Sequence, residues 1–149
     1  MRIREVMTAE VVTAAPGCSV REVAELMRER NVGSVVLTDE AGAPAGFITD
    51  RDLAVGVIAD GRDGSDDAFD HASTPVVTVG LGEDVEEAAR LMVEHGIRRL
   101  AVVDGERLTG IVTLDDLAVR IGDLELARHM TQQITSAALP GFYFHEREQ

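Results

Sequence analysis

Two hydroxyl–carboxylate pairs stand at the same spacing in two parts of the chain. Thr49 precedes Asp52 in the stretch G-F-I-T-D-R-D-L, and Thr113 precedes Asp116 in G-I-V-T-L-D-D-L. Each pair follows a short apolar run typical of a strand and precedes an apolar pattern typical of a helix. The threonine can cap that helix, whose positive N-terminus suits an anion such as phosphate. The aspartate is placed to accept hydrogen bonds from neighbouring hydroxyls, such as those of a ribose.

A capping box by itself would explain this spacing if it occurred once. The match between the two parts is much longer than the motif, because Val76-Val77-Thr78 repeats Val11-Val12-Thr13 at an offset of 65 residues. The apolar residues of the following helix recur at the same offset, and the motif itself recurs at an offset of 64. A duplicated unit of this length indicates two structural repeats.

The pattern of each repeat predicts strand, helix, strand, strand and helix. We therefore expect a mixed α/β (α+β) fold, in which the two repeats pack together with pseudo-twofold symmetry, because neither can cover both faces of its sheet alone. The predicted boundaries are repeat 1 over 1–60, an acidic linker over 61–70, repeat 2 over 71–125, and a C-terminal helix and tail over 126–149.

The linker region is rich in aspartate, which raises the question of a calcium site. An EF-hand spacing would require glycine at position 68 and glutamate at position 74, where Ala68 and Thr74 stand. The stretch is therefore interpreted as a solvated linker.

Composition argues against several classes of protein. The 149 residues carry a net charge of −13, which disfavours nucleic acid as a partner because phosphate contacts require a basic surface. No apolar run is long enough to span a bilayer, and the first residues lack the apolar core of a signal peptide, so we expect no membrane association and a cytoplasmic location. Cys18 is the only cysteine, and the four histidines show no metal-ligand spacing, so no metal site is expected.

With its two repeats, each closing on G-h-x-T-x-x-D, the chain resembles a tandem pair of cystathionine-beta-synthase (CBS) domains, also called a Bateman module. The resemblance covers about residues 3–125. The layout is similar to that of stand-alone bacterial CBS-pair proteins, including hypoxic response proteins.

The resemblance implies a non-catalytic regulatory module that senses an adenosine ligand in clefts between the two repeats. AMP, ADP and ATP are the expected ligands, with S-adenosylmethionine and NAD as further members of the class, and no cofactor is required. The resemblance also implies a homodimer, with a regulated protein partner that the sequence does not identify. The alternative is a structural or partner-binding CBS-pair protein with degenerate nucleotide sites. An enzyme is disfavoured, because the sequence offers no nucleophile–base pair and no metal cluster.

Carried over residue by residue, the resemblance makes Asp52 and Asp116 the acceptors for ribose hydroxyls and places Thr49 and Thr113 beside the phosphate. The first strand of each repeat would line the base pocket. The residues concerned are Val12, Thr13 and Ala14 in repeat 1, and Val77, Thr78 and Val79 in repeat 2.

The best candidates for contacts with phosphate are Arg98 and Arg99, in the second strand of repeat 2, since a guanidinium can bind phosphate with two hydrogen bonds. Alternation along a strand directs them to opposite faces, so at most one should face a given cleft. The equivalent positions of repeat 1 are Gly33 and Ser34, which carry no charge. Arg51 and His95 are weaker phosphate candidates.

The last helix is predicted to run to about Ala138 and to end at Pro140-Gly141. An aromatic cluster, Phe142-Tyr143-Phe144, follows in a chain that is otherwise poor in aromatic residues. Such a tail is expected to pack on its own domain or on a partner subunit.

Overall fold

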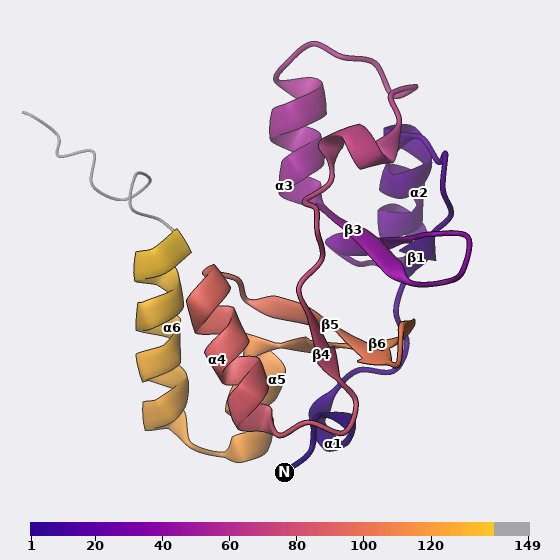
Figure 1. Cartoon of the computed structure of the whole chain (residues 1–149). Helices are drawn as coiled ribbons and strands as arrows, with labels where there is room; N and C mark the ends of the chain where they lie inside the picture. Colours follow the sequence, from indigo (N-terminus) through magenta and orange to yellow (C-terminus); the bar gives the residue numbers. More distant parts are fainter. Residues whose placement is uncertain (139–149) are drawn as a thin grey trace, which may run out of the picture. The chain divides into compact units, whose positions relative to one another are not determined.

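The computed structural model describes residues 1–138, and the chain divides into two compact units (Figure 1). We call residues 9–76 with 103–109 the repeat-1 body, and residues 1–8 and 77–102 with the chain from 110 onward the repeat-2 body. Both bodies combine helices with a three-stranded sheet, which confirms the predicted α+β class. The side chains that are not described within the last helix are those of Leu124, Leu126, Ala127, Thr135, Ala137 and Ala138.

The repeat-1 body is built on a sheet of order β1-β2-β3, in which β1 is parallel and β3 antiparallel to the central strand. Its elements are β1 (Thr13–Ala14), α2 (Val20–Arg30), β2 (Ser34–Thr38), β3 (Pro44–Thr49) and α3 (Asp50–Asp52). Helix α2 begins at Ser19, whose side chain accepts from Glu22 N, and ends at Asn31 in the left-handed conformation. The core of this body includes Val23 and Val35, both fully buried.

The helix that follows the motif of repeat 1 changes its form after one turn. α3 is followed by a π-helix, η1 (Leu53–Ile58), whereas the equivalent helix of repeat 2, α5 (Leu114–Ile121), is a regular α-helix. η1 contains Gly56, and a Cβ atom at this position would lie 3.2 Å from Nδ1 of His71. The missing side chain therefore lets His71 approach the helix backbone, a contact that the sequence pattern alone did not indicate.

The repeat-2 body has the equivalent sheet, of order β4-β5-β6, and one helix more. Its elements are β4 (Thr78–Gly80), α4 (Val85–His95), β5 (Arg99–Asp104), β6 (Arg107–Thr113), α5 and α6 (Leu124–Ala138). The turn between β5 and β6 and the adjoining strand ends, residues 103–109, are counted with the repeat-1 body. Helix α6 lies against α4 and α5 and buries Met130 and Ile134 in the core (Figure 1). The predicted helix to Ala138 is confirmed, while Pro140, Gly141 and the cluster Phe142–Phe144 lie outside the described residues.

The segment that precedes the first strand of repeat 1 packs in the repeat-2 body. Helix α1 (Ile3–Val6) buries Ile3 completely, and Ile3 N donates to Glu83 O at 2.9 Å. Val85 N donates to Met1 O at 3.0 Å, so the start of α4 is closed by the first residue of the chain.

The segment that precedes repeat 2 does the same for the repeat-1 body. The 3₁₀-helix η2 (Ala68–His71) buries Ala68 completely, and Ala68 N donates to Cys18 O at 2.9 Å. Val20 N donates to Asp66 O at 2.9 Å. These residues stand 65 positions from their counterparts in the other body, so each body is completed by the segment that precedes the first strand of the other repeat.

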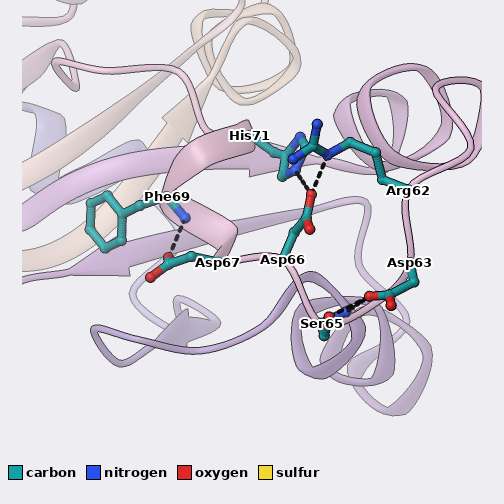
Figure 2. A network of polar contacts seen from close by, with 7 residues as sticks. All are labelled: Arg62, Asp63, Ser65, Asp66, Asp67, Phe69 and His71. Carbon is teal, nitrogen blue, oxygen red and sulfur yellow. Dashed lines mark hydrogen bonds and ion pairs between the residues drawn. The ribbon is translucent and has the colours of Figure 1, made fainter.

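The acidic linker is more than a solvated connection. Asp66 accepts hydrogen bonds from Arg62 Nε and from His71 Nε2, the latter at 2.8 Å, and the His71 side chain is only 10% exposed (Figure 2). Asp67 caps η2 by accepting from Phe69 N at 2.9 Å, and Asp63 accepts from Ser65 N at 2.7 Å. The carboxylates therefore hold the exposed linker in a folded conformation, and backbone hydrogen bonds from Val20 N to Asp66 O and from Arg21 N to Gly64 O attach it to the repeat-1 body.

Candidate functional site

The two predicted hydroxyl–carboxylate pairs form the same local structure. In repeat 1, Asp52 N donates to Thr49 Oγ1 at 3.2 Å, while Asp52 Oδ2 accepts from Thr49 N at 2.8 Å and from Thr49 Oγ1 at 3.0 Å. In repeat 2, the corresponding distances between Thr113 and Asp116 are 3.1, 2.8 and 2.8 Å. Both pairs are thus reciprocal capping boxes, and the threonine hydroxyl proton is already donated to the aspartate.

One oxygen of each aspartate is left for another partner. Asp52 and Asp116 are half-buried, and within residues 1–138 no described hydrogen bond reaches Oδ1 of either carboxylate. Because an ionised carboxylate can accept about four hydrogen bonds, each aspartate can close its helix and still accept from a ligand hydroxyl. The cap also fixes the direction in which the second oxygen points.

The backbone N–H groups at the two helix starts are not equally available. In repeat 1, Asp50 N donates to Gly33 O at 3.0 Å and Arg51 N donates to Asp50 Oδ1 at 2.8 Å. In repeat 2, Leu114 N donates to Arg98 O at 2.9 Å, but the described hydrogen bonds include none from Asp115 N. The anion site predicted from the helix N-terminus is therefore largely taken up in repeat 1, and one donor is left in repeat 2.

The two arginines of repeat 2 differ in their surroundings. Arg98 is 55% exposed, and its guanidinium lies 3.9 Å from Asp115 Oδ1, a loose ion pair on an exposed carboxylate. Arg99, the first residue of β5, is half-buried and is engaged in an interaction of its own. An exposed pair of this length stabilises little, so Arg98 can turn from Asp115 to a bound phosphate at small cost.

Repeat 1 has a carboxylate where repeat 2 has this arginine. A Cβ atom at Gly33, the position equivalent to Arg98, would lie 3.1 Å from Asp50 Oδ2. Asp50 and Asp115 both lie inside the motif, between its threonine and its last aspartate. The sequence analysis did not consider either of them as part of the site. The letters T-D-R-D and T-L-D-D already showed that the two motifs differ in the placement of charge.

The residues predicted to line a base pocket lie on the edge strands or, for Val12 and Val77, directly before them. Ala14 and Val79 are buried in the cores of their bodies, and Val12 and Val77 pack partly against the same cores. Of these six residues only Thr13 and Thr78 are exposed, and they occupy equivalent positions in the two repeats. Because an edge strand leaves alternate backbone N–H and C=O groups unpaired by its sheet, β1 and β4 offer backbone rather than side-chain contacts to a base.

Within each body, the edge strand and the motif flank the central strand. In the repeat-1 body Thr13 pairs with Val36 and Thr49 pairs with Ser34, both on β2. Two strand spacings separate the edge strand from the motif strand by about 10 Å. A ligand that contacts both needs a hydroxyl-bearing part and a second polar part some distance away, as a nucleoside has.

The remaining candidates are peripheral. Arg51 is exposed and has an interaction of its own, and His95 is exposed in the last turn of α4. Burial, together with the charges of Glu22 and Asp67, raises the pKa of the Cys18 thiol, which favours its protonated form. In the described part of the chain no three His, Cys, Asp or Glu side chains gather as metal ligands would, and no helix there is long and apolar enough to cross a bilayer.

Comparison with protein families places the repeats in a known group. The family model described as "CBS domain" matches residues 3–58 and again 68–123, so each match begins at one of the exchanged segments. The CBS domain-containing protein YhcV of Bacillus subtilis is 40% identical over 117 residues, covering 78% of this chain and 83% of the relative. Hypoxic response protein 1 of Mycobacterium tuberculosis is 30% identical over 116 residues, covering 77% and 81%.

Solved structures agree with this comparison. The CBS domain protein PAE2072 from Pyrobaculum aerophilum, complexed with AMP, aligns with a TM-score of 0.75 at 30% identity, over 86% of this chain and 99% of that one. The CBS domain pair of protein MJ0100, in complex with 5'-methylthioadenosine and S-adenosyl-L-methionine, aligns with a TM-score of 0.72 at 26% identity, over 82% and 96%.

Proposed function

Because this chain belongs to the CBS-domain family, with one domain in each repeat, we propose that it is a non-catalytic regulatory module that senses an adenosine nucleotide. CBS-pair proteins of similar structure hold AMP, 5'-methylthioadenosine or S-adenosyl-L-methionine. The proposed ligand for this chain is a member of the AMP, ADP and ATP group.

One observation carries the proposal. Asp52 and Asp116 use one carboxylate oxygen to close the capping box and leave Oδ1 to accept from a ligand, at equivalent places in both repeats. A capping box needs only one oxygen, so the cap explains the motif but does not occupy the whole carboxylate. We assign Oδ1 of each aspartate to a ribose hydroxyl, and the edge strands at Thr13 and Thr78 to the base.

The threonines receive a different role from the one implied by resemblance alone. Thr49 and Thr113 donate their hydroxyl protons to the aspartates, so we propose that they position the carboxylates rather than donate to phosphate. In repeat 2 the phosphate contacts fall to Arg98 and to Asp115 N. In repeat 1 the negative carboxylate of Asp50 would repel a phosphate, so we expect the repeat 2 motif to be the stronger site for a phosphorylated ligand.

We further propose that the protein acts as a homodimer in the cytoplasm and requires no metal cofactor. Val55 and Val119 occupy equivalent positions on the last helix of each repeat and are 52% and 77% exposed. A second copy that packs on these helices would remove their side chains from water. The single cysteine agrees with a compartment where disulfides do not form.

The alternative is a structural or partner-binding CBS-pair protein with degenerate nucleotide sites. It is favoured by Gly33 and Asp50, which leave repeat 1 without a cation at the position of Arg98. Under this alternative the capping boxes serve folding only, and no adenosine ligand binds to either motif.

Isothermal titration with AMP, ADP, ATP and S-adenosylmethionine separates the two functions. Asp116→Asn is the most informative variant, because its amide oxygen can still accept from Thr113 N while its NH₂ group cannot accept from a ribose. We expect this substitution to weaken binding by about 1–3 kcal/mol, or roughly 5- to 150-fold, the cost of a lost buried acceptor.

Asp63→Asn is the matched control, since it removes the same charge from the linker and should leave the affinity unchanged. Asp52→Asn reports on repeat 1 in the same titration. Equal loss of affinity in Asp63→Asn and Asp116→Asn would show that the motif is not the site. If none of the four ligands binds to the wild-type protein, the partner-binding function replaces the one proposed.

A further inference from the structure

The residue that follows the motif threonine differs between the two repeats. It is Asp50 in repeat 1 and Leu114 in repeat 2. Leu114 is 2% exposed and belongs to the core of its body, whereas Asp50 is exposed. The start of the motif helix therefore carries a carboxylate that a ligand can reach in repeat 1, and an apolar side chain turned into the core in repeat 2.

The same backbone hydrogen bond fixes this residue in both bodies. Asp50 N donates to Gly33 O at 3.0 Å, and Leu114 N donates to Arg98 O at 2.9 Å. Gly33 and Arg98 are equivalent by the repeat, and each lies directly before the central strand of its sheet. Because this bond joins the motif to the same place on the sheet, the surroundings of the two motifs can be compared position by position.

The missing side chain of Gly33 makes room for the carboxylate of Asp50. A Cβ atom on Gly33 would lie 3.1 Å from Asp50 Oδ2 and 3.6 Å from its carboxylate carbon. The carboxylate thus occupies the space in which a side chain at position 33 would begin. In repeat 2 the side chain of Arg98 begins there and is 55% exposed. Repeat 1 therefore presents an anion where repeat 2 presents a cation.

The N–H groups of the motif add to this difference. Asp50 N is bonded to Gly33 O, and Arg51 N donates to Asp50 Oδ1 at 2.8 Å, so both are already used. Arg51 itself stands at the position of Asp115, is exposed and has an interaction of its own. An arginine before the central strand and an N–H group left over at the helix start both suit a phosphate, and the described residues provide them only in repeat 2.

We propose that the repeat-1 motif binds an adenosine ligand whose 5' substituent is positively charged, an ammonium or a sulfonium group. Asp50 is the residue that determines this specificity, because its carboxylate attracts a cation and repels a phosphate. Asp52 Oδ1 accepts from the ribose, as Asp116 Oδ1 does in repeat 2. The specificity rests on the proposed function, since the ribose contact is common to both motifs. The chain thereby responds to two chemically different adenosine compounds.

Three compounds that differ only at the 5' position isolate the effect of charge. Adenosine is neutral there, 5'-amino-5'-deoxyadenosine carries an ammonium group, and AMP carries a phosphate. Isothermal titration of Asp116→Asn protein leaves repeat 1 as the intact motif. We expect the ammonium compound to bind roughly three- to tenfold more tightly than adenosine, and AMP to bind more weakly than adenosine. AMP binding as tight as that of the ammonium compound would overturn the specificity.

Substitution of Asp50 tests its role directly. Asp50→Asn, added to Asp116→Asn, keeps an oxygen that can accept from Arg51 N but removes the charge. It should abolish the difference in affinity between the ammonium compound and adenosine. Asp60→Asn is the matched control, because it removes an exposed carboxylate outside the motif and should preserve that difference. An equal effect of the two substitutions would assign the preference to net charge and not to Asp50.

The pattern of repeat 2 can also be transferred to repeat 1. Gly33→Arg combined with Asp50→Leu removes the carboxylate that a side chain at position 33 would meet and supplies the arginine. We expect this double variant to reverse the order, so that AMP binds more tightly than the ammonium compound. A variant that melts like its parent and still prefers the ammonium compound would contradict the role of Asp50. If the double variant does not fold, the Asp50→Asn titration decides.

The outcomes separate this specificity from the proposed function. Binding of AMP to the wild-type protein that is lost in Asp116→Asn, together with equal affinity of repeat 1 for adenosine and the ammonium compound, would sustain the function and overturn the specificity. Binding of the ammonium compound should instead be lost in Asp52→Asn. If no adenosine compound binds to the wild-type protein, the proposed function fails and the specificity fails with it.

Discussion

At the residue scale, the T-x-x-D motif uses one oxygen of its carboxylate for the helix cap. Oδ2 of Asp116 closes the capping box with Thr113, and the proposed function assigns Oδ1 to a ligand hydroxyl. Because the threonine proton is donated to the aspartate, the proposed role of the hydroxyl in binding is to orient the carboxylate. A capping box and the proposed ligand contact are thus compatible, since they use different oxygens of the same aspartate.

Substitution of Thr113 separates the two purposes. Thr113→Val keeps the size of the side chain but removes both the acceptor for Asp116 N and the donor to Asp116 Oδ2. We expect it to lower the free energy of unfolding by about 1 kcal/mol, the usual value of an N-cap, as measured by urea denaturation at pH 7. Thr113→Ser retains both hydrogen bonds and serves as the control. Equal stability of the valine and serine variants would show that the cap contributes nothing.

At the element scale, the linker and η2 show how acidic residues become structural. Asp66 accepts hydrogen bonds from Arg62 and His71, and both of these bonds lower the pKa of its carboxyl group (Figure 2). His71 can lie beside η1 because Gly56 has no side chain there. The π-helix, the glycine and the polar network therefore form one arrangement, which is specific to repeat 1 among the described residues.

The lowered pKa of Asp66 predicts how this arrangement responds to acid. Its stabilising contribution is present above the unfolded pKa of about 4 and is lost as the pH falls through the lower pKa of the folded state. Urea unfolding at pH 7, 5 and 3 should therefore show that Asp66→Asn is less stable than wild type at pH 7, with a difference that shrinks toward pH 3. Asp60→Asn, an exposed carboxylate of the same loop, is the control. A difference that stays constant across this range would exclude the network as its source.

At the scale of the whole molecule, each body depends on a segment that precedes the first strand of the other repeat. Residues 1–8 complete the repeat-2 body, and η2 completes the repeat-1 body. The close approach of the first segment is visible at Gly110, where a Cβ atom would lie 2.7 Å from Met7 Sδ and 2.9 Å from Thr8 O. A cut between the repeats would therefore deprive both halves of part of their packing.

Truncation of Ile3 tests this exchange. The side chain is fully buried among residues of the repeat-2 body, so Ile3→Ala should cost about 2–5 kcal/mol of stability. Amide hydrogen exchange should accelerate in α4, whereas Arg4→Ala, an exposed neighbour on α1, should have little effect. Faster exchange in α2 without a change in α4 would contradict the assignment of α1 to the repeat-2 body.

Much of the local structure could be predicted from the sequence because it depends on near neighbours. Ser19 and Glu22 form the capping box that begins α2, Asn31 ends it, and the duplicated motif marked both helix starts. The family and the α+β fold followed from the repeat, since a duplication of 65 residues preserves the order of strands and helices. The strand limits moved by one or two residues, as at β1, where only pairing with β2 defines the ends.

The sequence by itself determined the two repeats, their elements, the motif pair and the uneven distribution of arginine between the repeats. Only the tertiary structure decided which segment completes which body, which aspartate oxygen is taken, and that Ala14 and Val79 point into cores. It also showed that the exposed acidic stretch is ordered by hydrogen bonds between its own residues. The physical reason is the range of the interactions: caps and periodic patterns act over about one helical turn, whereas these contacts join residues that are brought together only when the chain folds.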